Sequence, residues 1–133
     1  MTRPNAFPVF QHLLTLLTQG TTWAASGDDP RLGCSCYGLV RYAYAQAGIV
    51  LPGTPEEAEV LFTLVPLPYE PWDVLLWNFE PWHGPRHLAL LLTPMQGIHS
   101  SASTNGLARF RLTDGLVQRV LTHAWRYKGW ACT

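Results

Sequence analysis

The hydrophobic pattern of the chain changes near its middle, from helical spacing to short apolar runs. In residues 7–17 the apolar positions are three and four apart, and Gly20 follows as a stop signal. The same spacing returns in residues 36–47, with Ser35 as an N-cap residue and Gly48 as the stop. This spacing places apolar side chains on one face of a helix. The pattern therefore predicts two amphipathic helices, separated by a polar loop over residues 21–33.

Beyond these helices the pattern predicts mainly strands. The sequence Thr54-Pro55-Glu56-Glu57 is typical of a helix start and predicts a short helix over residues 54–64. After the proline-bounded segment 66–71, short apolar or alternating runs lie between turn residues. They predict five strands over residues 73–79, 87–93, 97–101, 107–112 and 122–128, with a helical turn over residues 113–120. This order predicts an α+β fold, in which the second helix packs on one face of a mostly antiparallel sheet of about five strands.

The length and composition fit one globular domain over residues 1–133. Hydrophobic residues make up 47% of the chain and charged residues 14%, and nine basic side chains balance nine acidic ones. The absence of a basic run disfavours nucleic acid as a partner. No apolar run reaches the roughly 18 residues that a membrane span needs. Residues 1–18 lack the features of a signal peptide, so we expect a protein made in the cytoplasm without one.

Cysteine is the residue type that points to chemistry. The chain has Cys34, Cys36 and Cys132, and neither their odd number nor their spacing indicates a disulfide framework or a zinc site, so no metal is expected. Cys36 falls in the first turn of the second helix, where N–H groups and the helix dipole favour a thiolate. Such a setting lowers a thiol pKa into the range of roughly 3.5–7.5 and predicts a nucleophile. A buried cysteine at a helix start fits the position equally well.

Two histidines are candidate partners for this thiol. His87 opens a predicted strand, where it is placed to take a proton from a nucleophile. His99 lies on the next predicted strand, so a hairpin brings the two rings onto one face. His99 then orients the His87 ring, as the third member of a triad does. Considered singly, His87 reads as an exposed strand end and His99 as a structural residue.

Four motifs occur in order along residues 20–127 and resemble those of the NlpC-type cell-wall cysteine peptidases. The motifs are Gly33-Cys34-Ser35-Cys36-Tyr37-Gly38-Leu39-Val40-Arg41, Trp72-Asp73-Val74-Leu75-Leu76-Trp77, His87-Leu88-Ala89-Leu90 and Gly97-Ile98-His99-Ser100. The resemblance implies a papain-like fold, with Cys36 as nucleophile, His87 as base and His99 as third member. Cys34 is then a companion without required chemistry.

The resemblance also points to Ser35 and Trp23 as candidates for contact with the substrate or the oxyanion. Ser35 stands where the family has an aspartate before the nucleophile, and it still caps the helix. Trp23 stands where the family has a tyrosine near the oxyanion, and its indole N–H is a donor.

The function implied by the resemblance is hydrolysis of peptidoglycan stem peptides near the D-glutamyl–diamino acid link. Within the family, the double cysteine and the ending Trp125-Arg126-Tyr127 resemble peptidases of phage tail tips and phage-derived gene transfer agents. This implies a location in the tail of a virion or phage-like particle, bound to a larger tail or hub protein. The aromatic, proline-held segments 67–72 and 79–82 are candidates for the docking surface, or else walls of the cleft.

Two other functions use the same residues. One is a structural subunit of a tail tip or baseplate that kept the fold while its chemistry faded. The other is a cytoplasmic acyltransferase or amidase on a related fold.

Overall fold

The computed structural model describes residues 2–78 and 87–130. Within them the main sheet has six strands in the order β3-β8-β4-β5-β6-β7, and all neighbouring strands are antiparallel. The strands are β3 (Phe62–Val65), β4 (Val74–Trp77), β5 (His87–Leu91), β6 (Gln96–Ser101), β7 (Gly106–Arg111) and β8 (Leu121–Tyr127). Two shorter strands, β1 (Asp28–Asp29) and β2 (Gly33–Cys34), form a separate pair.

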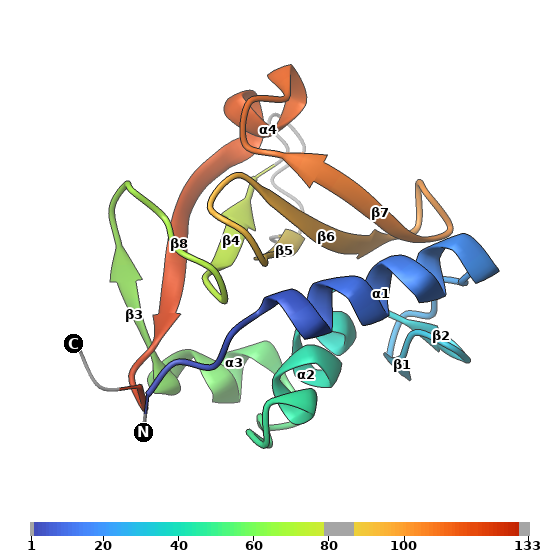
Figure 1. Ribbon diagram of the computed structural model, residues 1–133, viewed down its shortest axis with the longest axis horizontal. Coiled ribbons are helices and arrows are strands. Elements are labelled where there is room, and N and C mark those ends of the chain that lie inside the picture. Colours follow the sequence, from blue (N-terminus) through green and yellow to red (C-terminus); the bar gives the residue numbers. More distant parts are fainter. Residues whose placement is uncertain (1, 79–86, 131–133) are drawn as a thin grey trace.

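The helices are distributed unevenly around this sheet. Helices α1 (Phe7–Gln19), α2 (Cys36–Gln46) and α3 (Pro55–Ala58) lie on one side of it, and α4 (Gly115–Val120) lies at the far end, between β7 and β8 (Figure 1). Both predicted amphipathic helices, the helical turn and all five predicted strands are therefore confirmed, within one or a few residues at each end. The predicted α+β architecture is confirmed as well.

The segment 54–64 was predicted to be helical over its whole length, but only its first part is a helix. Helix α3 ends at Ala58, a 3₁₀ turn covers Glu59–Leu61, and β3 follows. The prediction was wrong from Phe62 onward because the backbone of β8 supplies a ladder, in which Phe62 pairs with Tyr127. That partner lies 65 residues further along the chain, so local propensity gives no sign of it.

The two faces of the sheet carry separate apolar clusters. In β4, Val74 and Leu76 face the cluster that packs under the helices, whereas Leu75 and Trp77 face a second cluster. In β5, Leu88 and Leu90 likewise face the helices, and Ala89 and Leu91 face the second cluster. This alternation follows from the two-residue period of a strand. It fixes which side chains of the sheet are available to helix α2.

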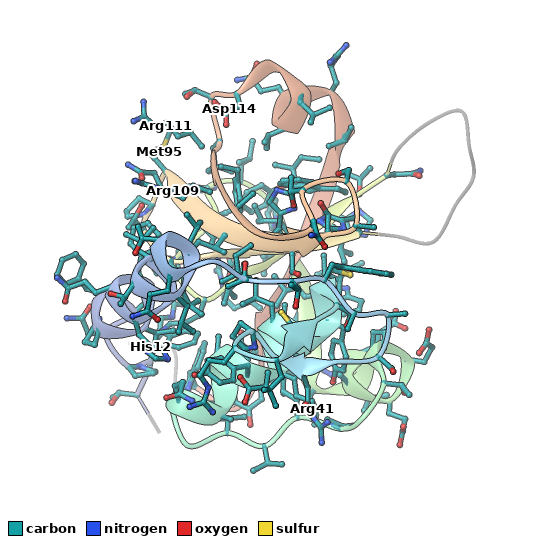
Figure 2. All side chains as sticks on the ribbon, turned by 90° about the vertical axis from the view of Figure 1, so that its right-hand side faces the viewer. His12, Arg41, Met95, Arg109, Arg111 and Asp114 are labelled. Carbon is teal, nitrogen blue, oxygen red and sulfur yellow. The ribbon has the colours of Figure 1, made fainter. Side chains whose placement is uncertain are left out.

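Most charged side chains lie at the periphery of this arrangement, although the buried Asp73 pairs with Arg126 over 2.8 Å. Figure 2 shows Arg109, Arg111 and Asp114 along one outer side of the molecule and Arg41 on another, pointing away from the middle. None of the helices within residues 2–78 and 87–130 is long and apolar enough to cross a membrane.

The two aromatic residues of the predicted docking segment 67–72 do not lie on the surface. Trp72 is completely buried, and its Nε1–H donates to the Pro4 carbonyl over 2.9 Å. Tyr69 is buried in the second cluster, whereas Leu67 and Pro68 are exposed. The prediction is wrong for the two aromatic residues because the N-terminal segment and the core cover them. The other predicted segment, 79–82, lies outside the described residues.

Candidate active site

Helix α2 presents Cys36 as its first residue. Ser35 is the N-cap: its backbone is extended, and its Oγ accepts a hydrogen bond from the Gly38 N–H over 3.0 Å. This confirms the predicted cap. The loop before the helix packs closely on this first turn, since a Cβ on Gly38 would lie 1.8 Å from the Gly27 carbonyl oxygen. The glycine therefore allows the loop and the helix start to hold Cys36 between them.

Cys36 lines a cleft of about 450 Å³ between α2, the α3 region and the sheet. The sheet contributes an apolar wall, and the α3 region contributes two exposed carboxylates, Glu56 and Glu59. The residues along the cleft are Cys36, Tyr37, Pro55, Glu56, Glu59, Leu76, Leu88 and Trp125. A nucleophile in a cleft of this size is accessible to part of a peptide chain. Neither glutamate was identified as a site residue from the sequence, where Glu56 was interpreted only as part of a helix-start signal and Glu59 was not singled out.

His87 and His99 form a hydrogen-bonded pair, as their predicted positions on adjacent strands required. Nε2 of His87 lies 2.8 Å from Nδ1 of His99, and one of these nitrogens donates to the other. Trp77 packs against both rings, with centroid distances of 5.3 Å to His87 and 4.9 Å to His99. Phe110 lies 6.1 Å from the His99 ring. The pair is thus seated among the aromatic residues of the second cluster.

The thiol and the imidazoles lie at the start of β5. Cys36 packs against the cluster on the helix side, and the backbone N–H of Leu88 is near enough to its sulfur to oppose the rise of its pKa. The histidine rings pack on Trp77, which pairs with His87 between β4 and β5. Strand β5 pairs with β6 at Leu90 and Leu91, so the first residues of β5 lie beyond that ladder. The sulfur is therefore at the residue that follows His87, at the opening of the sheet.

Burial keeps all three groups in their neutral forms. Burial raises the pKa of the Cys36 thiol, although hydrogen bonds from the N–H groups of Leu88, Tyr37 and Cys36 itself oppose the shift. Burial, with a smaller contribution from the charge of His99, lowers the pKa of His87 to about 4. Burial alone lowers the pKa of His99 to about 4. The predicted lowering of the thiol pKa is therefore wrong, because desolvation outweighs the helix N-terminus.

The remaining predicted residues lie around the nucleophile without lining the described cleft. Ser35 uses its hydroxyl in capping, and it also donates weakly to the Gly27 carbonyl over 3.4 Å. Trp23 is 37% exposed, and its backbone forms a parallel bridge to Cys34. Cys34 is completely buried, and burial raises the pKa of its thiol. Among the described residues, no group of three or more histidine, cysteine or acidic side chains could hold a metal ion.

The helix-borne cysteine and the paired histidines on an antiparallel sheet define the papain-like class of fold. The NlpC/P60 family model matches residues 20–126, so the chain belongs to the NlpC/P60 family. This match includes Cys36, His87 and His99.

Individual relatives cover different shares of the chain. Over 39 residues, or 29% of the chain, it is 44% identical to the bifunctional muramidase/DL-endopeptidase CwlT of Bacillus subtilis strain 168, and it spans 12% of that protein. An NLP/P60 family protein similar to a lipoprotein, from Staphylococcus aureus Mu50, has a TM-score of 0.70 and 17% identity. That match covers 96% of this chain and 43% of the other.

A third relative is a non-catalytic protein. RipD from Mycobacterium tuberculosis is described as a non-catalytic NlpC/p60 domain protein adapted to peptidoglycan binding. It has a TM-score of 0.58 and 17% identity, and the match covers 90% of this chain and 97% of RipD. At these identities the two structures show the fold alone. Because the family includes a non-catalytic protein, the function of this chain has to be argued from its own site.

Proposed function

We propose that the chain is a cysteine endopeptidase that hydrolyses stem peptides of the bacterial cell wall. The observation that carries the proposal is the position of Cys36, in an open cleft with its sulfur at the N–H of Leu88, next to the His87–His99 pair. Membership of the NlpC/P60 family supports the substrate, and so does the similarity to a DL-endopeptidase over 39 residues.

The first step is attack by the Cys36 sulfur on the carbonyl carbon of the scissile peptide. Because thiol and imidazole are both neutral at rest, the proton passes from sulfur to His87 during the attack. Nε2 of His87 is the ring nitrogen that faces His99, over 2.8 Å. The protonated His87 then gives its proton to the leaving amine as the carbon–nitrogen bond breaks, which leaves a thioester on Cys36.

Hydrolysis of the thioester completes the cycle. His87 takes a proton from an incoming water, whose oxygen attacks the thioester carbonyl, and the carbon–sulfur bond breaks to release the acid. The sulfur takes up the proton from His87 and the site returns to its neutral state. Throughout, His99 holds the His87 ring in one orientation by the 2.8 Å hydrogen bond and favours the charged ring that forms transiently.

The oxyanion of both steps needs hydrogen-bond donors close to Cys36. The backbone N–H of Cys36 is one candidate, because the first N–H groups of a helix have no partner within the helix. The Trp23 indole remains another candidate, from the loop that leads into α2. The predicted candidate Ser35 is less suited to this role, because its backbone N–H donates to the Gly27 carbonyl over 3.0 Å and its Oγ caps the helix.

Digestion of purified sacculi tests this proposal. Wild-type protein should release muropeptides cut between the second and third stem residues, identified by mass spectrometry. Cys36→Ala should release none, and Cys34→Ala, which removes the buried neighbouring thiol, is the matched control and should retain cleavage. If wild-type protein leaves every muropeptide intact across several wall chemotypes, the proposal fails.

A second candidate function is binding of peptidoglycan without cleavage. The observation in its favour is the neutral thiol, because burial raises the pKa of Cys36 and no thiolate–imidazolium pair is present at rest. Co-sedimentation with sacculi separates the two functions. Binding by wild-type protein without any released product would favour this candidate.

We also propose that the protein acts in the tail of a phage or phage-like particle, attached to a larger tail or hub protein. The support is the resemblance of the double-cysteine motif to tail-tip peptidases. Fractionation of particles from the producing cells should place the chain in the tail fraction. A protein found only outside particles would contradict this location.

A further inference from the structure

One buried hydroxyl connects the strand that carries His99 with the loop that carries Cys36. Ser100 lies on β6 directly after His99 and is completely buried. Its Oγ donates a 2.8 Å hydrogen bond to the backbone carbonyl of Cys34, across 66 residues of sequence. None of the reactions proposed above uses this hydroxyl.

Cys34 is a junction of the loop that leads into α2. Its N–H donates to the Thr22 carbonyl over 3.2 Å, and its carbonyl also accepts from the Ala24 N–H over 3.3 Å. These bonds stay within the loop and tie it to itself. A second link to the sheet, from the Leu107 N–H to Thr21 Oγ1, joins the loop 13 residues before Cys34. The bond from Ser100 therefore links the loop to the sheet two residues before the nucleophile.

Most of the remaining contact between α2 and the sheet is apolar; near the other end of the helix, the Tyr44 hydroxyl donates to the Trp72 carbonyl over 2.6 Å. Ile98, Leu88 and Leu90 belong to the cluster that packs under the helix. Apolar contact sets the distance between two layers but has no preferred direction along them. A hydrogen bond is directional and loses strength within a few tenths of an ångström. The Ser100 bond is thus able to set the position of the helix start along β6.

We infer that Ser100 is a positioning residue, whose bond to the Cys34 carbonyl places the Cys36 sulfur against the Leu88 N–H and beside the paired histidines. The inference rests on the proposed function only for its effect on hydrolysis, because the position of the sulfur is measurable without a substrate. β6 carries both Ser100 and His99, so the same strand positions the nucleophile and the group that orients the base.

The test measures alkylation of Cys36 by iodoacetamide, resolved from the other cysteines by peptide mass spectrometry, together with kcat and KM. Ser100→Ala should lower the alkylation rate constant and kcat about 10-fold to 100-fold, because small displacements of reacting groups have effects of that size. KM should not change. Ser101→Ala is the matched control: its hydroxyl bonds to Ser103 and Thr104 within the next turn, and both rates should stay at the wild-type value.

Two further variants separate positioning from packing. Cys34→Ala keeps the carbonyl acceptor and should keep both rates, whereas Ser100→Thr keeps the hydroxyl and should restore most of the loss. If Ser100→Ala alkylates at the wild-type rate, the inference is overturned. It is equally overturned if Ser100→Ala fails to fold, or if Ser100→Thr is as slow as Ser100→Ala. Should wild-type protein cleave no muropeptide while Ser100→Ala still slows alkylation, positioning stands and the proposed function fails.

Discussion

The two halves of the candidate site have different surroundings. Cys36 lines an open cleft at the start of helix α2, where nearby backbone N–H groups favour its thiolate. The His87–His99 pair is instead packed against Trp77 and Phe110. Burial is nevertheless the largest influence on all three pKa values, and it favours the neutral form of each group. Under the proposed function, this comparison favours proton transfer during the attack over an ion pair that exists at rest.

The largest effect is expected on the helix side. Cys36→Ala should lower the rate of peptide hydrolysis by on the order of 10⁴-fold or more, because no other group replaces the sulfur. The fold should persist, as Cys36 is half-buried and the cap at Ser35 is retained. Hydrolysis by purified protein and circular dichroism measure the two properties.

Cys34→Ala is the control that fixes the register of the motif. Its activity should stay within a few-fold of wild type, although loss of a completely buried side chain lowers the midpoint of thermal unfolding. If Cys36→Ala is active and Cys34→Ala is inactive, the nucleophile is Cys34 and the assignment to Cys36 is wrong.

On the histidine side the effects should be graded. His87→Gln should lower kcat by roughly 10²–10⁴-fold, the range for loss of a general acid–base. His99→Asn keeps a side-chain amide able to hydrogen-bond the His87 ring, so its loss of kcat should be smaller, about 10-fold. Measurement of kcat for each variant shows which of the two losses is larger. Equal losses for the two variants would show that His99 does more than orient its neighbour.

The same two histidines should make folding stability depend on pH. Their pKa is about 4 in the folded chain and about 6.5 when exposed. Between these values the unfolded state binds more protons, so stability should fall as the pH drops from 6.5 to 4. Each ring contributes up to about 3 kcal/mol. Urea unfolding at pH 7 and at pH 4.5 measures the loss.

A variant with both rings replaced sharpens this test. His87→Gln combined with His99→Asn should be less stable at pH 7 but should lose less stability between pH 7 and pH 4.5. An unchanged pH dependence in the double variant would assign the effect to carboxylates elsewhere.

The contrast between the two halves of the site also separates what could be predicted from the sequence from what could not. The helix start at Cys36 and the spacing of His87 and His99 are local patterns, and both were predictable. Strand β3 was not, because its partner β8 lies far along the chain and the Thr54-Pro55 helix signal dominates locally. The shifts in pKa were not predictable either. They depend on Trp77 and Phe110, which reach the histidines only after β4 and β7 join the sheet.

The smallest expected effect decides whether thiol and imidazole are charged at rest. Since burial raises the pKa of Cys36, alkylation by iodoacetamide should have its midpoint above the value of about 8.5 for a free thiol. A neutral His87 carries no charge to stabilise a thiolate, so His87→Gln should move this midpoint by only a few tenths of a pH unit. Cys36 is followed by peptide mass spectrometry, with the unfolded chain in urea as the reference. A midpoint well below 8.5 that rises in His87→Gln would mean that an ion pair exists and that the two halves of the site are coupled before substrate binds.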